Sequence, residues 1–115
     1  MNLNYEKKND IIIVYVNSPL DIGNSPLIQR DISTLISQFP DYNFVLNMES
    51  VEFMNSAGLG VLIISTKRLE SNNRCLKISN LNDAVKKVIQ ILDAHEIINV
   101  YDTEDEAVKS FELRG

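Results

Sequence analysis

Short apolar segments alternate with helical patterns along the chain, and this alternation restricts the fold more than any other feature. The clearest strand is 11–16, an almost unbroken β-branched and aromatic run that suits a strand covered on both faces. The helical pattern that follows has apolar residues at spacings of four, three and four, namely Ile28, Ile32, Leu35 and Phe39. Strands that alternate with helices predict a mostly parallel sheet with right-handed crossovers.

The complete pattern predicts strand, strand, helix, strand, helix, strand, helix, strand, helix. Leu3 and Tyr5 mark a half-exposed first strand, which forms a hairpin with the second. The remaining strands are expected at 44–48, 74–79 and 97–101, and the second helix at about 57–71. The third helix carries Val85, Val88, Ile89 and Leu92 on one face, and the fourth turns Ala107, Val108 and Phe111 inward. The prediction is an α/β fold, a mostly parallel mixed sheet of about five strands with about four helices, in one domain spanning 1–115.

Polar residues at the predicted helix ends fit as caps and stops. Pro40 ends the first helix, because the residue before a proline avoids helical angles. The pair Asn72-Asn73 is a plausible stop for the second. The expected N-caps are Ser25 with Pro26 behind it, Asn80 or Asn82, and Thr103 in a capping box with Glu106.

Charge and cysteine content restrict the partners and the compartment. The chain has 16 acidic and 11 basic residues, for a net charge of −5. An acidic surface repels phosphate backbones and anionic lipid, so we expect neither nucleic acid nor a membrane surface as partner. Cys75 is the sole cysteine, which excludes an intrachain disulfide and fits a reducing cytoplasm. The N-terminus does not resemble a signal peptide, and no run approaches the ~20 apolar residues that span a bilayer, so a cytoplasmic location without membrane insertion is expected.

The residues of common active sites are missing from the pattern. His95 is the only histidine and is expected at the surface near the end of the third helix. Gly58-Leu59-Gly60 has no lysine where a phosphate-binding loop needs one. The sequence therefore predicts no catalytic residue and no metal site, and we expect a protein that is not an enzyme.

The segment 51–62 has the most unusual composition in the chain. A strand ends, the polar pair Asn55-Ser56 follows, and glycines open a helix. Capping of that helix is by itself a sufficient explanation for the polar pair, and close packing of helix on sheet explains the glycines. The loop that holds Asp21 follows a parallel strand as well, so both loops are expected at the carboxyl edge of the sheet, where ligands and partners of such sheets bind. Asp21 there could equally be a turn-forming residue.

This segment resembles the signature of the STAS domain, as found in anti-sigma factor antagonists, usually written D-S-[ST]-G-L-G. Here it stands as Asn55-Ser56-Ala57-Gly58-Leu59-Gly60. Leu20-Asp21 before the first helix, the segment 76–81 before the third, and Val-Tyr-Asp-Thr-Glu-Asp-Glu-Ala near the end are also similar to the family. The resemblance covers nearly the whole chain.

The resemblance implies a protein-binding switch that needs no cofactor of its own. In the family, a partner that is both anti-sigma factor and serine kinase phosphorylates the serine that matches Ser56, and a metal-dependent phosphatase removes the phosphate. The unphosphorylated form binds the kinase and frees a sigma factor, whereas phosphorylation breaks the complex. The residues expected at the partner surface are Asp21, Met54, Asn55, Ser56, Ala57, Gly58 and Leu59. Phe53 and Leu59 are expected mainly in the core, while Met54 fits the core and a binding surface equally well.

The chain departs from the family signature at two positions. Asn55 replaces the usual aspartate, which keeps a helix cap but removes a negative charge beside Ser56. Ala57 replaces a second hydroxyl and leaves Ser56 as the sole phosphate acceptor in this loop.

Two alternative interpretations remain open from the sequence. The chain could be a constitutive STAS subunit, for example of a lipid-transport ATPase or another signalling complex, with Ser56 only a cap; co-purified partners distinguish this from the switch. It could also bind nucleotide or act as an enzyme, in which case purified protein would bind nucleotide tightly and Gly58→Val would abolish that binding.

Overall fold

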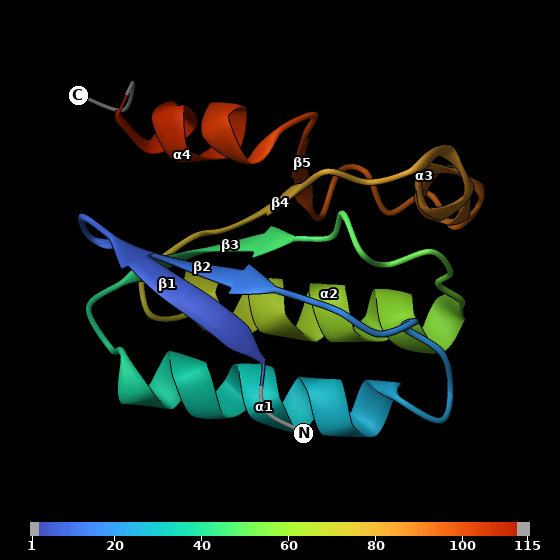
Figure 1. Ribbon diagram of the computed structural model, residues 1–115, viewed down its shortest axis with the longest axis horizontal. Helices are drawn as coiled ribbons and strands as arrows, with labels where there is room; N and C mark the ends of the chain where they lie inside the picture. The colour runs from blue at the N-terminus through green and yellow to red at the C-terminus, as the bar shows by residue number, and fades with distance from the viewer. Residues whose placement is uncertain (1–2, 113–115) are drawn as a thin grey trace.

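Five strands form one sheet in the order β1-β2-β3-β4-β5 in the computed structural model, which describes residues 3–112. β1 pairs antiparallel with β2, and the pairs from β2 to β5 are parallel. The strands are β1 (Asn4–Lys8), β2 (Ile11–Tyr15), β3 (Asn43–Asn47), β4 (Leu76–Ser79) and β5 (Asn99–Tyr101). The helices are α1 (Ser25–Gln38), α2 (Ser56–Glu70), α3 (Asp83–Ile91) and α4 (Glu104–Glu112). The predicted α/β fold and its element order are confirmed (Figure 1).

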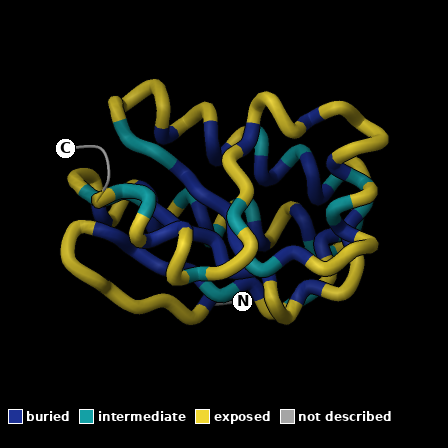
Figure 2. Tube along the Cα trace, turned by 90° about the horizontal axis from the view of Figure 1, so that it is seen from above, coloured by how far each residue is buried: buried dark blue, intermediate teal, exposed yellow. Residues whose placement is uncertain are grey.

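Helices cover both faces of the sheet. α1 and α2 lie side by side on one face, and α4 lies on the other (Figure 1). The larger apolar core joins the first face to α1, α2 and α3, while a smaller cluster of Ile11, Ile13, Val45, Ala107 and Val108 lies beneath α4. The buried stretches run through the middle of the molecule and the exposed ones along its outline (Figure 2). β2 and β3 thus have both faces covered, as their apolar runs predict.

A residue with a left-handed backbone conformation follows the end of both α2 and α3. Asn73 has φ 61° and Asp93 has φ 55°. In each case the N–H of the next residue donates to the carbonyl oxygen five residues earlier, from Arg74 to Leu69 and from Ala94 to Ile89. This Schellman arrangement satisfies carbonyl groups left over at a helix end. It confirms the stop at Asn72-Asn73.

The end of α3 corrects the prediction for Leu92. The helix stops at Ile91, and Leu92 is 47% exposed rather than on the buried face. The left-handed turn at Asp93 redirects the chain, so that Ala94 and Ile98 enter the core in its place.

The start of α1 corrects the predicted cap. Ser25 is the first helical residue and Asn24 the N-cap, so the predicted boundary is one residue late. Asp21 explains the shift, because its Oδ1 accepts the N–H of Asn24 at 2.8 Å and its carbonyl accepts the N–H of Ser25 at 2.9 Å. Asn82 and Thr103 cap α3 and α4 as expected. The Asn82 side-chain oxygen accepts the N–H of Val85, and the Thr103 hydroxyl oxygen accepts the N–H of Glu106.

Candidate functional site

Two loops meet at the carboxyl edge of β2 and β3. The backbone N–H of Leu20 donates to the carbonyl of Phe53 at 2.9 Å, and the N–H of Asn55 donates to the carbonyl of Leu20 at 3.1 Å. These bonds form a parallel bridge between Leu20 and Met54 beyond the ends of the two strands. Figure 1 shows both loops leaving the arrowheads of their strands at the same end of the molecule. The predicted juxtaposition of the Asp21 loop with Asn55-Ser56 is therefore present.

Asn55 caps α2 with its side chain. Its Oδ1 accepts the N–H groups of Ala57 at 3.0 Å and Gly58 at 3.3 Å, and its carbonyl accepts the N–H of Leu59 at 3.0 Å. The Asn55 side chain therefore caps the helix as an aspartate at this position would, but without the negative charge.

Ser56 is the first residue of α2 and is exposed. Because Asn55 already occupies the donors of Ala57 and Gly58, the Ser56 hydroxyl is not needed to satisfy the helix end. Ser56 therefore lies exposed at the positive end of the helix dipole.

The glycines of the signature differ in what surrounds them. A Cβ on Gly58 would lie 2.3 Å from the carbonyl oxygen of Leu20 and 2.8 Å from Cγ of Met54, so only glycine lets α2 approach the loop bridge this closely. A Cβ on Gly60 would meet no atom within 4 Å among the described residues. The expectation of close packing is correct for Gly58 and wrong for Gly60.

The three apolar residues of the signature region divide between core and surface. Leu59 is 4% exposed and Met54 2% exposed, so both side chains belong to the core. Phe53, expected in the core, is instead 53% exposed. The bridge to Leu20 gives the physical reason, since neighbouring residues of an extended segment face opposite sides and Met54 takes the inward one.

An apolar groove of about 340 Å³ lies between the N-terminal halves of α1 and α2, and its lining includes Ala57, the neighbour of Ser56 in the chain. Ile22 and Ile64 form exposed apolar walls, and Gly60 leaves the groove open where a side chain would fill it. Sequence reasoning missed this groove. The available signal was Ile64, an apolar residue outside the helix face that carries Leu62 and Leu69.

No cluster of three or more His, Cys, Asp or Glu side chains able to hold a metal occurs within residues 3–112. Over the same range, none of the helices has the length and apolar character needed to cross a membrane. His95 is exposed, as expected, with Nδ1 3.5 Å from Oδ1 of Asp93.

The fold, the exposed serine at the start of α2 and the glycine pattern agree with the family comparison. The model of the STAS domain family matches residues 2–107, and the chain belongs to this family. An anti-sigma F factor antagonist of Paenibacillus polymyxa is 24% identical over 115 residues, which cover 98% of each chain. An anti-sigma-B factor antagonist of Bacillus subtilis is 26% identical over 102 residues, covering 87% of this chain and 92% of the relative.

Solved structures match the fold over nearly the full length. The anti-sigma factor antagonist SpoIIAA in its unphosphorylated form has a TM-score of 0.78 and 24% identity, with 98% of both chains covered. The Bacillus SpoIIAA structure in the phosphorylated form has a TM-score of 0.68 and 23% identity, covering 95% of this chain and 98% of that one.

Proposed function

We propose that this chain is an anti-sigma factor antagonist that acts as a partner switch through Ser56. In its unphosphorylated form it binds an anti-sigma factor that is also a serine kinase, and so releases a sigma factor. Phosphorylation of Ser56 breaks this complex, and a metal-dependent phosphatase resets it. The observation that carries the proposal is the exposed Ser56 at a helix start already capped by Asn55, next to an apolar groove. The names of the two relatives support the part of the proposal that makes the chain an anti-sigma factor antagonist.

The partner surface in this proposal is the rim around Ser56. Asn55, Ala57 and the backbone of Gly58 lie next to Ser56 along the chain, and Asp21 lies in the loop that is bridged to theirs through Leu20 and Met54. The groove between α1 and α2 receives an apolar side chain of the partner. Met54 and Leu59 act from the core by fixing the loop and the helix rather than by contact.

The switching step follows from charge. A phosphoryl group adds roughly −1.5 to −2 charge at neutral pH. The dipole of α2 tolerates this charge locally, whereas a partner surface shaped for a neutral hydroxyl and an apolar groove does not. A loss of about 2.8 kcal/mol at the interface weakens binding about a hundredfold.

Asn55 lowers the cost of that phosphorylation. An aspartate charge about 4 Å from the phosphate would oppose it by about 1 kcal/mol in water, or about 4 kcal/mol at an effective dielectric near 20. Asn55 removes this repulsion and keeps both capping hydrogen bonds. The departure from the family signature is thus compatible with a phosphorylated Ser56.

The direct test maps phosphorylation on the protein isolated from its native cells by mass spectrometry. We expect phosphate on Ser56 that changes with growth condition, and a serine kinase among the proteins that co-purify with the unphosphorylated form. Ser56 unmodified in every condition, together with a co-purifying ABC ATPase, would refute the switch and favour a constitutive subunit.

A matched pair of variants tests the charge step with the isolated kinase partner. Ser56→Asp should weaken binding at least about tenfold, or about 1.4 kcal/mol. Ser50→Asp, which adds the same charge to another exposed serine in the loop before α2, should bind like wild type. Equal binding by Ser56→Asp and wild type contradicts the proposal.

A further inference from the structure

The segment 51–55, which leads into α2, is held at both of its ends. At its start, the side chain of Asn82 donates from Nδ2 to the carbonyl of Val51 at 3.2 Å and to the carbonyl of Glu52 at 3.3 Å. At its end, the segment is held by the backbone bridge to Leu20. Because Asn82 is the N-cap of α3, this helix fixes the start of the segment and the loop before α1 fixes its end.

Asn82 makes these contacts with the same amide group that caps α3. Its Oδ1 accepts the N–H of Val85 at 2.8 Å, while its Nδ2 faces the two carbonyls. The opposite orientation of the amide would place an oxygen against the carbonyls and an NH₂ group against the N–H, and it would lose all three hydrogen bonds. Serine and aspartate cap a helix as well as asparagine does, but neither supplies the two amide donors.

Burial alone does not determine the path of the segment. Val51 and Met54 are 0% and 2% exposed and point into the core, whereas Glu52 and Phe53 are exposed. The hydrophobic effect that holds the two buried side chains is non-directional, whereas hydrogen bonds fix the direction of the carbonyl groups. The direction in which this short segment enters α2 therefore depends on its hydrogen bonds to Asn82 and Leu20.

We propose that Asn82 is a positioning residue for Ser56. From α3 it fixes the path of the segment 51–55, and this path determines where the Ser56 hydroxyl is presented to the kinase. The inference rests on the proposed function, because it assigns Asn82 a role in phosphorylation of that serine. Phosphoryl transfer depends on an attacking hydroxyl that is held close to the phosphate and in line with the leaving group. A segment that is free at its start presents the hydroxyl over a wider range of positions, so phosphorylation becomes slower.

Two variants separate the cap of α3 from the contacts with the segment. Asn82→Asp keeps the size of the side chain and its capping oxygen but removes the donor. Asn82→Ser also keeps a capping oxygen and adds no charge. Thr103→Asp is the matched control, because it places the same charge at the N-cap of α4, which has nine residues like α3 and makes none of these contacts with the segment.

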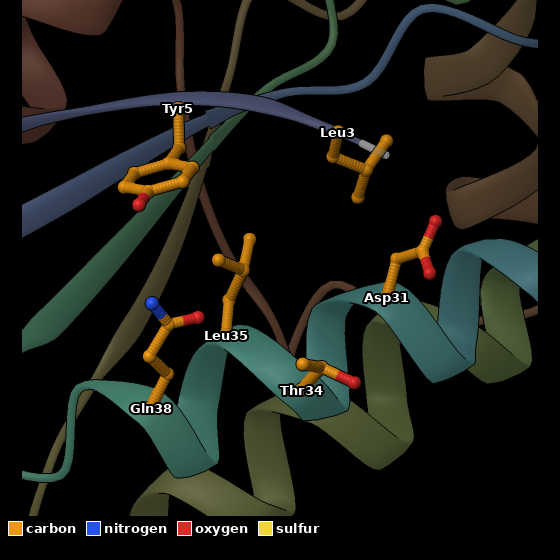
Figure 3. Close-up of a pocket in the computed structure, with 6 residues that line it drawn as sticks. All are labelled: Leu3, Tyr5, Asp31, Thr34, Leu35 and Gln38. Atoms are coloured by element: carbon orange, nitrogen blue, oxygen red, sulfur yellow. The ribbon is translucent and has the colours of Figure 1, made fainter. Parts of the chain in front are cut away.

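Amide hydrogen exchange of the isolated chain, followed by NMR, tests the positioning without a partner. In both Asn82 variants the bridging N–H groups of Leu20 and Asn55 should exchange about fivefold faster than in wild type, and in Thr103→Asp at the wild-type rate. The second half of α1 is the internal reference and should be unchanged; it lines a separate cavity of about 300 Å³ opposite Leu3 and Tyr5 (Figure 3). Wild-type exchange of both bridging N–H groups in the two Asn82 variants would overturn the proposal.

Phosphorylation by the isolated kinase partner tests the consequence for Ser56. Both Asn82 variants should be phosphorylated about tenfold more slowly than wild type and Thr103→Asp when the chain is saturating. Equal rates in the Asn82 variants and wild type would overturn the proposal. Wild type that is not phosphorylated at all would refute the proposed function and the role of Asn82 in it, whereas faster exchange in the variants would still support the contact between α3 and the segment.

Discussion

Gly58 and Gly60 occupy neighbouring positions in the first turns of α2 but tolerate different substitutions. A methyl group on Gly58 would collide with the Leu20 carbonyl, so Gly58→Ala should lower the free energy of unfolding by about 1–3 kcal/mol through overpacking. Gly60→Ala meets open space and replaces a glycine within a helix, so it should raise that free energy by about 0.5–1 kcal/mol. Urea unfolding of the two variants measures both values, and equal effects would contradict the assigned packing.

The contrast between the glycines also decides which variants test binding cleanly. Gly58→Val, the variant suggested by the nucleotide-binding interpretation, would disturb the bridge between Leu20 and Met54 whatever the protein binds. Gly60→Ala keeps the fold and adds a methyl group inside the groove beside Ser56. Gly60→Ala therefore tests the proposed interface without disturbing the fold, which Gly58→Val cannot do.

At the scale of elements, Tyr15 of β2 interacts with Glu6 of β1 and with Glu104 of α4. Its hydroxyl donates to Glu6, while Glu104 at the start of α4 accepts from Asn47. Burial raises the pKa of Tyr15 above its ordinary value, and the hydrogen bonds and negative charges of Glu6 and Glu104 raise it further. The folded protein therefore favours the neutral phenol.

This raised pKa predicts how stability depends on pH. The unfolded chain ionises Tyr15 near pH 10, whereas the folded chain retains the proton. The stabilisation is complete below about pH 10 and is lost as the pH rises above it. Between about pH 9 and pH 11, wild type should lose more free energy of unfolding than Tyr15→Phe does, as measured by urea unfolding at each pH. Parallel losses in the two proteins would show that Tyr15 has no such role.

Element order was predictable because periodicity and capping are local. Residues close together in the sequence determine three of the predicted features: the strand at 11–16, the helix stop at Asn72-Asn73 and the Thr103 cap. Phe53 and Leu92 were placed wrongly because a bridge to a distant loop and a left-handed turn decide which way they face.

The Ser56 loop could be located from its composition, but the surfaces around it could not. The groove beside Ser56 combines side chains from α1 and α2 and the loop before α1, so it exists only once the two helices have packed together.

At the scale of the whole molecule, the site is separate from most of the core. Ser56 is exposed, Asn55 holds the helix start, and the larger core is built from other residues of α1, α2 and the sheet. A charge added at Ser56 therefore acts on a partner and leaves the fold intact, in the proposed switch. The partner would sense phosphorylation as a change of surface charge rather than of shape.

Ser56→Asp tests this separation in the isolated chain. Its free energy of unfolding should stay within about 0.5 kcal/mol of wild type, or rise slightly, because the site is exposed and negative charge at the start of a helix is favourable. Urea unfolding gives the free energy, and amide NMR shifts should change only in the loops around Asp21 and Asn55 and in the first turn of α2. Shifts that extend to β4, β5 or α4, or a loss of several kcal/mol, would mean that phosphorylation refolds the domain.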